Sequence, residues 1–252
     1  MQFKTVIISD LHLGSHKAQA DRLLAFLKTV KCDTLILNGD IIDMWSLSRE
    51  WYFPQVHLQV VQSIIRLSKH TNVILLPGNH DPITKYVHDV RIGNIKIVDE
   101  HVHFIKDKKF LIQHGDAFDV ITRYSPLIAK LGDHAYEFAL WVNIHFNNLR
   151  FLLGMKYWSL SKFLKNSVKS VVKFIFAFEH AAIDSVRQLG YNGGIILGHI
   201  HCLALYKKDG IIYSNSGDWV ETCSWIAETD DGRLQTWEWN DGDPKMIAEL
   251  IV

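Results

Sequence analysis

Acidic, amide and histidine side chains recur along the chain wherever a short apolar run ends. Seven of them are candidate metal ligands: Asp10, His12, Asp40, Asn79, His114, His199 and His201. Carboxylate oxygens, an amide oxygen and imidazole nitrogens form a mixed set that suits Mn, Fe, Zn or Co better than Ca or Mg. Because seven ligands exceed what one ion needs, the pattern predicts two ions that share a carboxylate and act together on a phosphoryl group.

Five apolar runs must position these ligands. They cover residues 6–8, 34–37, 73–76, 110–113 and 194–197, and each leads directly into a motif rich in Gly, Asp, Asn or His. Such runs are typical of strands covered on both faces, and we expect the ligands to meet at one rim of the sheet. In the pairs Asp10/His12 and His199/His201, extended backbone would turn both side chains to the same side.

The remaining patterns predict an α/β sandwich. Residues 18–30 and a segment from Pro54 towards His70 carry apolar side chains at helical spacing, and both should cover the sheet. After His199 the pattern changes to short strands with turns at residues 208–210 and 230–232, which predicts an antiparallel meander that completes a second sheet. The expected architecture is a four-layer α/β/β/α sandwich.

Residues 119–190 do not fit this core. They are rich in aromatic residues, and within residues 156–178 lysines alternate with apolar side chains without an acidic residue, which predicts a basic amphipathic helix. We therefore expect one domain, residues 1–252, with residues 119–190 inserted as a helical cap over the site. The alternative is a helical subdomain whose aromatic residues only pack on the sandwich.

The amino-acid composition bears on the partners and the cellular compartment of the protein. Lys and Arg together number 27, as do Asp and Glu, so no global basic charge indicates a nucleic-acid-binding protein. The three cysteines are an odd number and widely separated, which favours reduced thiols in the cytoplasm. The first apolar run begins so early that no signal peptide is expected, and no run is long enough to span a bilayer.

The motif series D-x-H, G-D, G-N-H-D, H and G-H-x-H, in this order, resembles that of the calcineurin-like metallophosphoesterases. The resemblance implies that Asp10, His12, Asp40 and His201 hold one metal ion, and that Asp40, Asn79, His114 and His199 hold the other. Asp40 would bridge the two ions. His80 would lie beside the scissile phosphate with Asp81 orienting its ring, and Gly39, Gly78 and Gly198 would supply backbone freedom beneath the metals.

The helical insertion and the segment 215–219 (Asn-Ser-Gly-Asp-Trp) look like one branch of that superfamily, the UDP-2,3-diacylglucosamine diphosphatases of lipid A synthesis. This likeness implies two Mn²⁺ ions, attack of water on the α-phosphorus, and the products UMP and 2,3-diacylglucosamine 1-phosphate. It also implies an amphiphilic nucleotide-sugar lipid as partner and peripheral contact with the anionic inner face of the cytoplasmic membrane. The expected substrate contacts are Tyr124, Lys162, Lys165, Asn166 and Lys169.

One position departs from that branch. Many of its members carry Arg where this chain has His80, the residue typical of the wider superfamily. A fixed cation suffices when phosphate leaves, whereas a proton donor helps when an alkoxide leaves, and His can serve in both ways. A second hypothesis is therefore that the substrate is another phosphodiester, a nucleotide diphosphate or a phosphomonoester. A third is that the protein is a non-catalytic scaffold that docks on membranes.

Overall fold

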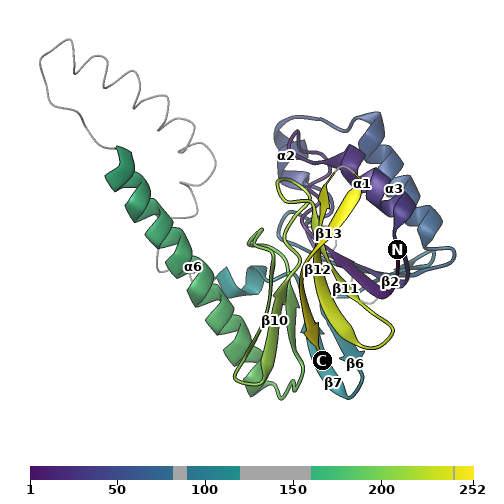
Figure 1. Cartoon of the computed structure of the whole chain (residues 1–252). Coiled ribbons are helices and arrows are strands. Elements are labelled where there is room, and N and C mark those ends of the chain that lie inside the picture. The colour runs from purple at the N-terminus through teal and green to yellow at the C-terminus, as the bar shows by residue number, and fades with distance from the viewer. Residues whose placement is uncertain (82–89, 120–159, 241) are drawn as a thin grey trace, which may run out of the picture. The chain divides into compact units, whose positions relative to one another are not determined.

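The computed structural model describes residues 1–81, 90–119, 160–240 and 242–252 (Figure 1). It divides the chain into two units, residues 1–116 with 182–252, and residues 117–181. The expected single domain with a cap over residues 119–190 stays a prediction.

The first sheet contains the strands that precede the first four expected ligands. In the described part of the chain it has eight strands in the order β13 (Asp243–Ile251), β12 (Arg233–Asn240), β11 (Ser224–Glu228), β1 (Gln2–Ile8), β2 (Lys31–Asn38), β3 (Asn72–Leu76), β5 (Ile95–Ile97) and β4 (Val90–Ile92). Strands β1, β2 and β3 are parallel, so their carboxyl ends lie at one edge.

The second sheet contains the strands that precede the other three. Its described strands follow the order β6 (His101–Ile105), β7 (Lys108–Ile112), β8 (Gly194–Leu197), β10 (Ile211–Asn215) and β9 (Ala204–Lys208). Strands β7, β8 and β10 are parallel to one another. A hairpin with Asp209 and Gly210 at positive φ joins β9 to β10, at the turn that the sequence predicts.

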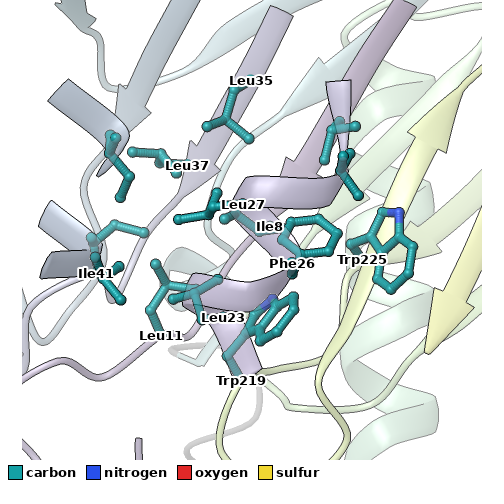
Figure 2. Close-up of a cluster of buried hydrophobic side chains, with 14 of the residues drawn as sticks. Ile8, Leu11, Leu23, Phe26, Leu27, Leu35, Leu37, Ile41, Trp219 and Trp225 are labelled. Carbon is teal, nitrogen blue, oxygen red and sulfur yellow. The ribbon is translucent and has the colours of Figure 1, made fainter. Parts of the chain in front are cut away.

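Alternation along the strands separates two apolar cores. On β1, Val6 and Ile8 belong to the core that also contains Leu23 and Phe26 of α1 (Ala20–Thr29) and Val60 of α3 (Gln55–Leu67). Figure 2 shows Leu23, Phe26 and Leu27 packed beside strand residues of this core. The other core holds residues of both sheets: Ile7, Ile36, Ile74 and Ile226 from the first, and Ile105, Phe110, Ile112, Ile196 and Ile212 from the second.

The predicted mixed α/β fold with two sheets is thus confirmed, as are its five ligand-bearing strands and the two helices near residues 18–30 and 54–70. Two expectations were wrong. The five strands do not share one sheet, because β1 to β3 belong to the first and β7 and β8 to the second. Of the expected meander, only β9 and β10 complete the second sheet, whereas β11 to β13 extend the first beyond β1. Apolar runs alone carry no information about which strands pair.

Three shorter or separate elements complete the description. Helix α2 (Met44–Arg49) follows Asp43, and a 3-10 turn covers Asp116–Phe118. Helix α6 (Leu160–Gln188) occupies part of the expected cap, and within the second unit Phe118 meets Phe178 edge to face at 5.7 Å. Among the described residues, no helix combines the length and apolarity that a membrane span requires.

A buried glutamate links the two sheets. Glu228 on β11 lies 2.7 Å from each of three groups, Lys4 Nζ and Thr5 Oγ1 on β1 and His103 Nε2 on β6. Burial alone would raise the pKa of Glu228, but the contacts with His103, Lys4 and Thr5 outweigh it and hold the pKa below its ordinary value of 4.5. A group of this kind stabilises the fold above about pH 4.5 and loses that contribution as the pH falls through its folded-state pKa.

Glu228→Gln is therefore expected to lower the free energy of unfolding at pH 7 by about 1–3 kcal/mol. The amide nitrogen that replaces one carboxylate oxygen cannot accept a hydrogen bond, so a charged contact of Glu228 is lost. The partial exposure of Lys4 screens its share. Urea unfolding between pH 3 and 7 measures this, and the variant should depend less on pH below 4.5 than the parent. Glu249→Gln, which alters the exposed pair with Arg233, is the matched control. Equal losses in the two variants would contradict the linking role.

Candidate metal centre

The loops after β1, β2, β3, β7 and β8 carry all seven expected ligands. Backbone hydrogen bonds hold these loops together: Asp10 N–H donates to Gly39 O at 3.0 Å, and Gly198 N–H donates to His114 O at 3.0 Å. Trp219 N–H, after β10, donates to Asp10 O at 3.0 Å. Ligands that are distant in sequence therefore come from two sheets to one place.

The backbone of most ligands is left-handed rather than extended. Positive φ angles occur at Asp10 (55°), His12 (47°), Asp40 (55°), His199 (69°) and His201 (51°). The expectation that extended backbone aligns the pairs Asp10/His12 and His199/His201 was therefore wrong. Residues with a Cβ rarely adopt this conformation, and each costs of the order of 1–3 kcal/mol. Strain concentrated on chemically capable side chains is typical of a functional site.

The first ligand cluster comprises Asp10, His12 and His201, whose donor atoms all lie within 4.8 Å of one another. Asp10 Oδ1 is 3.2 Å from His201 Nε2, and the Nε2 atoms of His12 and His201 are 3.3 Å apart. Burial would raise the pKa of Asp10, but His201, His114 and His12 hold it well below its usual range, so the carboxylate is charged.

The second cluster comprises Asp40, His114 and His199 within the same limit. His114 Nδ1 donates to Asn38 O at 2.8 Å, which leaves the electron pair of Nε2 for a metal ion. This Nε2 lies 3.3 Å from Asp40 Oδ2. Asp40 Oδ2 is also 3.8 Å from His12 Nε2. Asp40 thus stands between the two clusters, where a bridging ligand belongs.

Asn79 lies in the turn that encloses Asp40. Its neighbour His80 donates its backbone N–H to Asp40 Oδ1 at 2.8 Å, and a Cβ on Gly78 would collide with the same oxygen. Among the described residues, three buried atoms of this region have no hydrogen-bond partner in suitable geometry: Asn79 Oδ1, Asp10 Oδ1 and His114 Nε2. Buried polar atoms seldom lack partners, so we expect metal ions to bind these atoms, one at Asp10 and the other at Asn79 and His114.

The donor set fits divalent ions. Two imidazole nitrogens that bound one tetrahedral Zn²⁺ at roughly 2.0–2.1 Å would lie about 3.4 Å apart. The Nε2 atoms of His12 and His201 are 3.3 Å apart, which fits a shared ion. His12 Nδ1 lies 3.3 Å from Asp43 Oδ2, so its other nitrogen is turned towards Asp10. Carboxylate partners of this kind orient metal-ligating histidines and strengthen them as ligands.

His80 stands at the edge of these clusters. Its Nδ1 lies 3.0 Å from Asp43 Oδ1, and its donor atoms group with those of His12 and Asp40. Asp81, which we expected to orient this ring, accepts the backbone N–H groups of Ile41 and Ile42 at 2.8 Å each, and its role towards His80 stays a prediction. At Nδ1 the orienting carboxylate is that of Asp43.

Sequence reasoning missed Asp43 and Trp45. Asp43 also accepts the N–H and the hydroxyl of Ser46 at 2.8 Å, and so caps α2 while it holds His12 and His80. Its signal was an aspartate three residues after Asp40. Trp45, 49% exposed, lies over the His80 ring at 4.2 Å between centroids. In the sequence, its signal was a tryptophan five residues after Asp40.

The glycines act mainly by leaving room. Of Gly39, Gly78 and Gly198, from which we expected backbone freedom, only Gly39 has left-handed backbone, at φ 85°. A Cβ on Gly39 would meet the His114 ring, and one on Gly198 would meet Ser9 Oγ and Asp10 Oδ2. The ligand loops pack too tightly for any side chain there.

The side chains expected to contact the substrate lie outside the part of the chain that the structure describes. Tyr124 lies wholly outside it. Lys162, Lys165, Asn166 and Lys169 lie on α6, but their side chains are also outside what the structure describes. Their roles stay predictions.

Comparison with known families decides the lineage of this centre. Residues 3–203 match the family model of the calcineurin-like phosphoesterases. The chain belongs to that family. As a calcineurin-like phosphoesterase it has the ligand clusters expected of a family that binds divalent metals.

Similar solved structures have low identity to this calcineurin-like phosphoesterase. Vps29 of Chaetomium thermophilum has a TM-score of 0.50 at 8% identity, over 98% of this chain and 95% of that one. Vps29 of Cryptosporidium parvum scores 0.49 at 14% over 98% and 97%, and an archaeal phosphodiesterase scores 0.41 at 14% over 96% and 98%. The first likeness concerns the fold alone, and nothing follows from the others. The curated proteins contain no match.

Proposed function

We propose that this protein is a hydrolase of phosphoric esters or diphosphates that uses two divalent metal ions, most simply Mn²⁺. The observation that carries the proposal is the pair of ligand clusters, Asp10/His12/His201 and Asp40/His114/His199, with Asp40 and His12 also grouped together. When bound, two adjacent ions supply an acidified water and neutralise charge on the phosphoryl oxygens. Asn79 would complete the second ligand set.

The protein's own contribution to catalysis centres on His80. Burial opposes its charged form, but the hydrogen bond with Asp43 and the charges of Asp40 and Asp81 outweigh burial and raise its pKa. The imidazole of His80 therefore keeps its proton to a higher pH than an ordinary histidine, with Nδ1 held by Asp43. His80 would donate a proton to the leaving oxygen or stabilise the charge that develops there.

Hydrolysis of bis-p-nitrophenyl phosphate tests the reaction class. Protein stripped with a chelator should be inactive and should recover with added Mn²⁺, and metal analysis should find two ions per chain. A scaffold would show no turnover under any metal. That result, with metal bound or not, would refute the enzymatic proposal.

Asp43 offers a prediction about pH. In Asp43→Asn a single amide oxygen replaces two carboxylate oxygens, so the rings of His12 and His80 cannot both keep their acceptor. Turnover should fall by about 10–100-fold. Because Asp43 raises the pKa of His80, its loss should move the alkaline limb of the kcat/KM profile to lower pH.

A pH profile of the Asp43→Asn variant, measured with saturating Mn²⁺, checks this. Ser46→Ala is the matched control, since it removes one donor to Asp43 but leaves both histidine contacts. A lower rate with an unmoved alkaline limb would dissociate Asp43 from the protonation of His80.

As the specific substrate we propose UDP-2,3-diacylglucosamine, hydrolysed to UMP and 2,3-diacylglucosamine 1-phosphate by a cytoplasmic protein in peripheral contact with the anionic inner membrane surface. Two features support an amphiphilic substrate: the lysine-rich amphipathic sequence of α6 and the half-exposed Trp45 beside His80. Comparing turnover of this lipid with that of UDP-N-acetylglucosamine tests it. Equal or faster hydrolysis of the soluble diphosphate would favour another phosphodiester or nucleotide diphosphate.

The lysines of α6 give a second prediction. Replacing Lys162, Lys165 and Lys169 by Glu should raise KM for the lipid and weaken binding to anionic vesicles, because each cation near such a surface contributes about 1 kcal/mol. Hydrolysis of bis-p-nitrophenyl phosphate should barely change. Vesicle sedimentation and kinetics on both substrates measure the contrast.

A matched triple variant makes the same change of charge elsewhere. Lys28, Lys31 and Lys69 are exposed on α1, β2 and after α3, and their replacement by Glu should leave vesicle binding unaltered. If the two triple variants behave alike, the α6 lysines have no special role with lipid.

A further inference from the structure

A buried hydroxyl group lies directly behind the first ligand cluster. Ser9, directly after β1, is fully buried, and its Oγ makes a short hydrogen bond with Asp10 Oδ2. The same Oγ is 2.6 Å from Ser216 Oγ and 3.2 Å from Gly217 O. Because Ser216 follows β10, these contacts join a ligand loop of the first sheet to a loop of the second.

The available protons fix the direction of this chain of hydrogen bonds. Each hydroxyl has one proton, whereas an ionised carboxylate only accepts. Hydrogen bonds to a charged acceptor are the strongest, so the Ser9 hydroxyl donates to Asp10 Oδ2. Ser9 Oγ, at 2.6 Å, is then the acceptor for the Ser216 hydroxyl, in preference to Leu197 O at 3.1 Å. The hydrogen bonds therefore run from Ser216 through Ser9 to Asp10.

The two carboxylate oxygens of Asp10 have different surroundings. Oδ2 of Asp10 also accepts the backbone N–H of His199 at 3.0 Å, so it receives two donors. Oδ1 faces His201 Nε2 at 3.2 Å and His12 Nε2 at 3.9 Å. Gly198 is packed against both Ser9 Oγ and Asp10 Oδ2, which resists rotation of the carboxylate. One oxygen is held by the protein and the other is left for an ion.

We propose that Ser9, supported by Ser216, is a positioning residue that sets the metal affinity of the first cluster, Asp10/His12/His201, and has no such effect on the second. This inference rests on the proposed metal-dependent function. Substitutions behind a ligand typically weaken metal binding by about 10–100-fold.

Two variants, each without a ligand of one metal position, allow the affinity of the other position to be measured separately. Asn79→Ala removes a ligand of the second position, and His201→Ala removes one of the first. The Kd for Mn²⁺ is measured by calorimetry and by electron paramagnetic resonance of free Mn²⁺. Ser9→Ala should raise Kd about 10–100-fold in the Asn79→Ala background and leave it unchanged in the His201→Ala background. Ser216→Ala should act in the same direction with a smaller effect, because Ser9 keeps its own proton.

Ser214→Ala is the matched control, since Ser214 is equally buried on β10 but its hydroxyl donates to Ala204 O at 3.0 Å. It should change Kd in neither background. A loss of affinity that is equal in both backgrounds for Ser9→Ala, or absent from both, overturns the inference. If Ser9→Ala does not fold, Ser216→Ala decides by the same criterion. Parent protein that binds no Mn²⁺ would instead refute the metal-dependent function itself.

Discussion

Asp40→Ala is expected to lose turnover by several orders of magnitude together with most of the bound metal. Asp40 Oδ2 lies 3.3 Å from His114 Nε2 and 3.8 Å from His12 Nε2, which belong to different clusters. Burial would raise the pKa of Asp40, but His114 and His12 lower it below its ordinary value, so the variant removes a charged carboxylate. Two cations at short distance need that negative charge between them. Metal analysis and steady-state kinetics measure both effects.

The isosteric Asp40→Asn separates charge from packing. Its amide oxygen can still accept the backbone N–H of His80, which Asp40 Oδ1 accepts at 2.8 Å, so the loop should keep its shape. Asp33→Asn, on the exposed part of the same strand β2, is the control and should behave as the parent. Near-normal turnover of Asp40→Asn with two ions bound would show that the bridging assignment is wrong.

The sequence was sufficient for the strands that position the ligands. Each of the five runs is apolar on both faces, and the structure explains why: Val6 and Ile8 enter the core beneath α1, while Ile7 enters the core between the sheets. Burial on both faces removes the alternation that would mark a solvent face. The division of the strands between two sheets could not be predicted, because pairing depends on contacts that local patterns do not encode.

The interactions behind the ligands were less visible. Asp43 lies three residues after the predicted ligand Asp40, but its contacts with His12 and His80 require that the loops after β1, β2 and β3 meet. Ser9 gains its partner Ser216 only when a loop of the second sheet reaches the first. Left-handed backbone at five ligands is likewise imposed by tertiary packing, because residues with a Cβ keep this conformation only where the surrounding structure holds them in it. Ligand identity is local information, whereas ligand orientation is not.

His80→Ala is expected to keep both metal ions and to lose turnover by about 10²–10⁴-fold, the range for a positioned proton donor or electrostatic contact. The Nδ1 atom of His80 is engaged by Asp43 at 3.0 Å, which leaves Nε2 for the substrate. Metal content is the first measurement, because His80 also groups with His12 and Asp40 as a possible ligand. A variant that loses an ion would place His80 in the metal shell and contradict the prediction.

The leaving group then distinguishes the two roles of His80. A series of aryl phosphodiesters with increasingly basic leaving groups should show a loss that deepens along the series if His80 donates a proton, because a basic oxygen needs the proton most. A uniform loss would indicate stabilisation of charge alone, as is sufficient for a diphosphate whose leaving phosphate is already a stable anion. His70→Ala, which removes an exposed histidine after α3, should match the parent throughout. If His80→Ala also matched the parent on every substrate, His80 would have no part in the reaction.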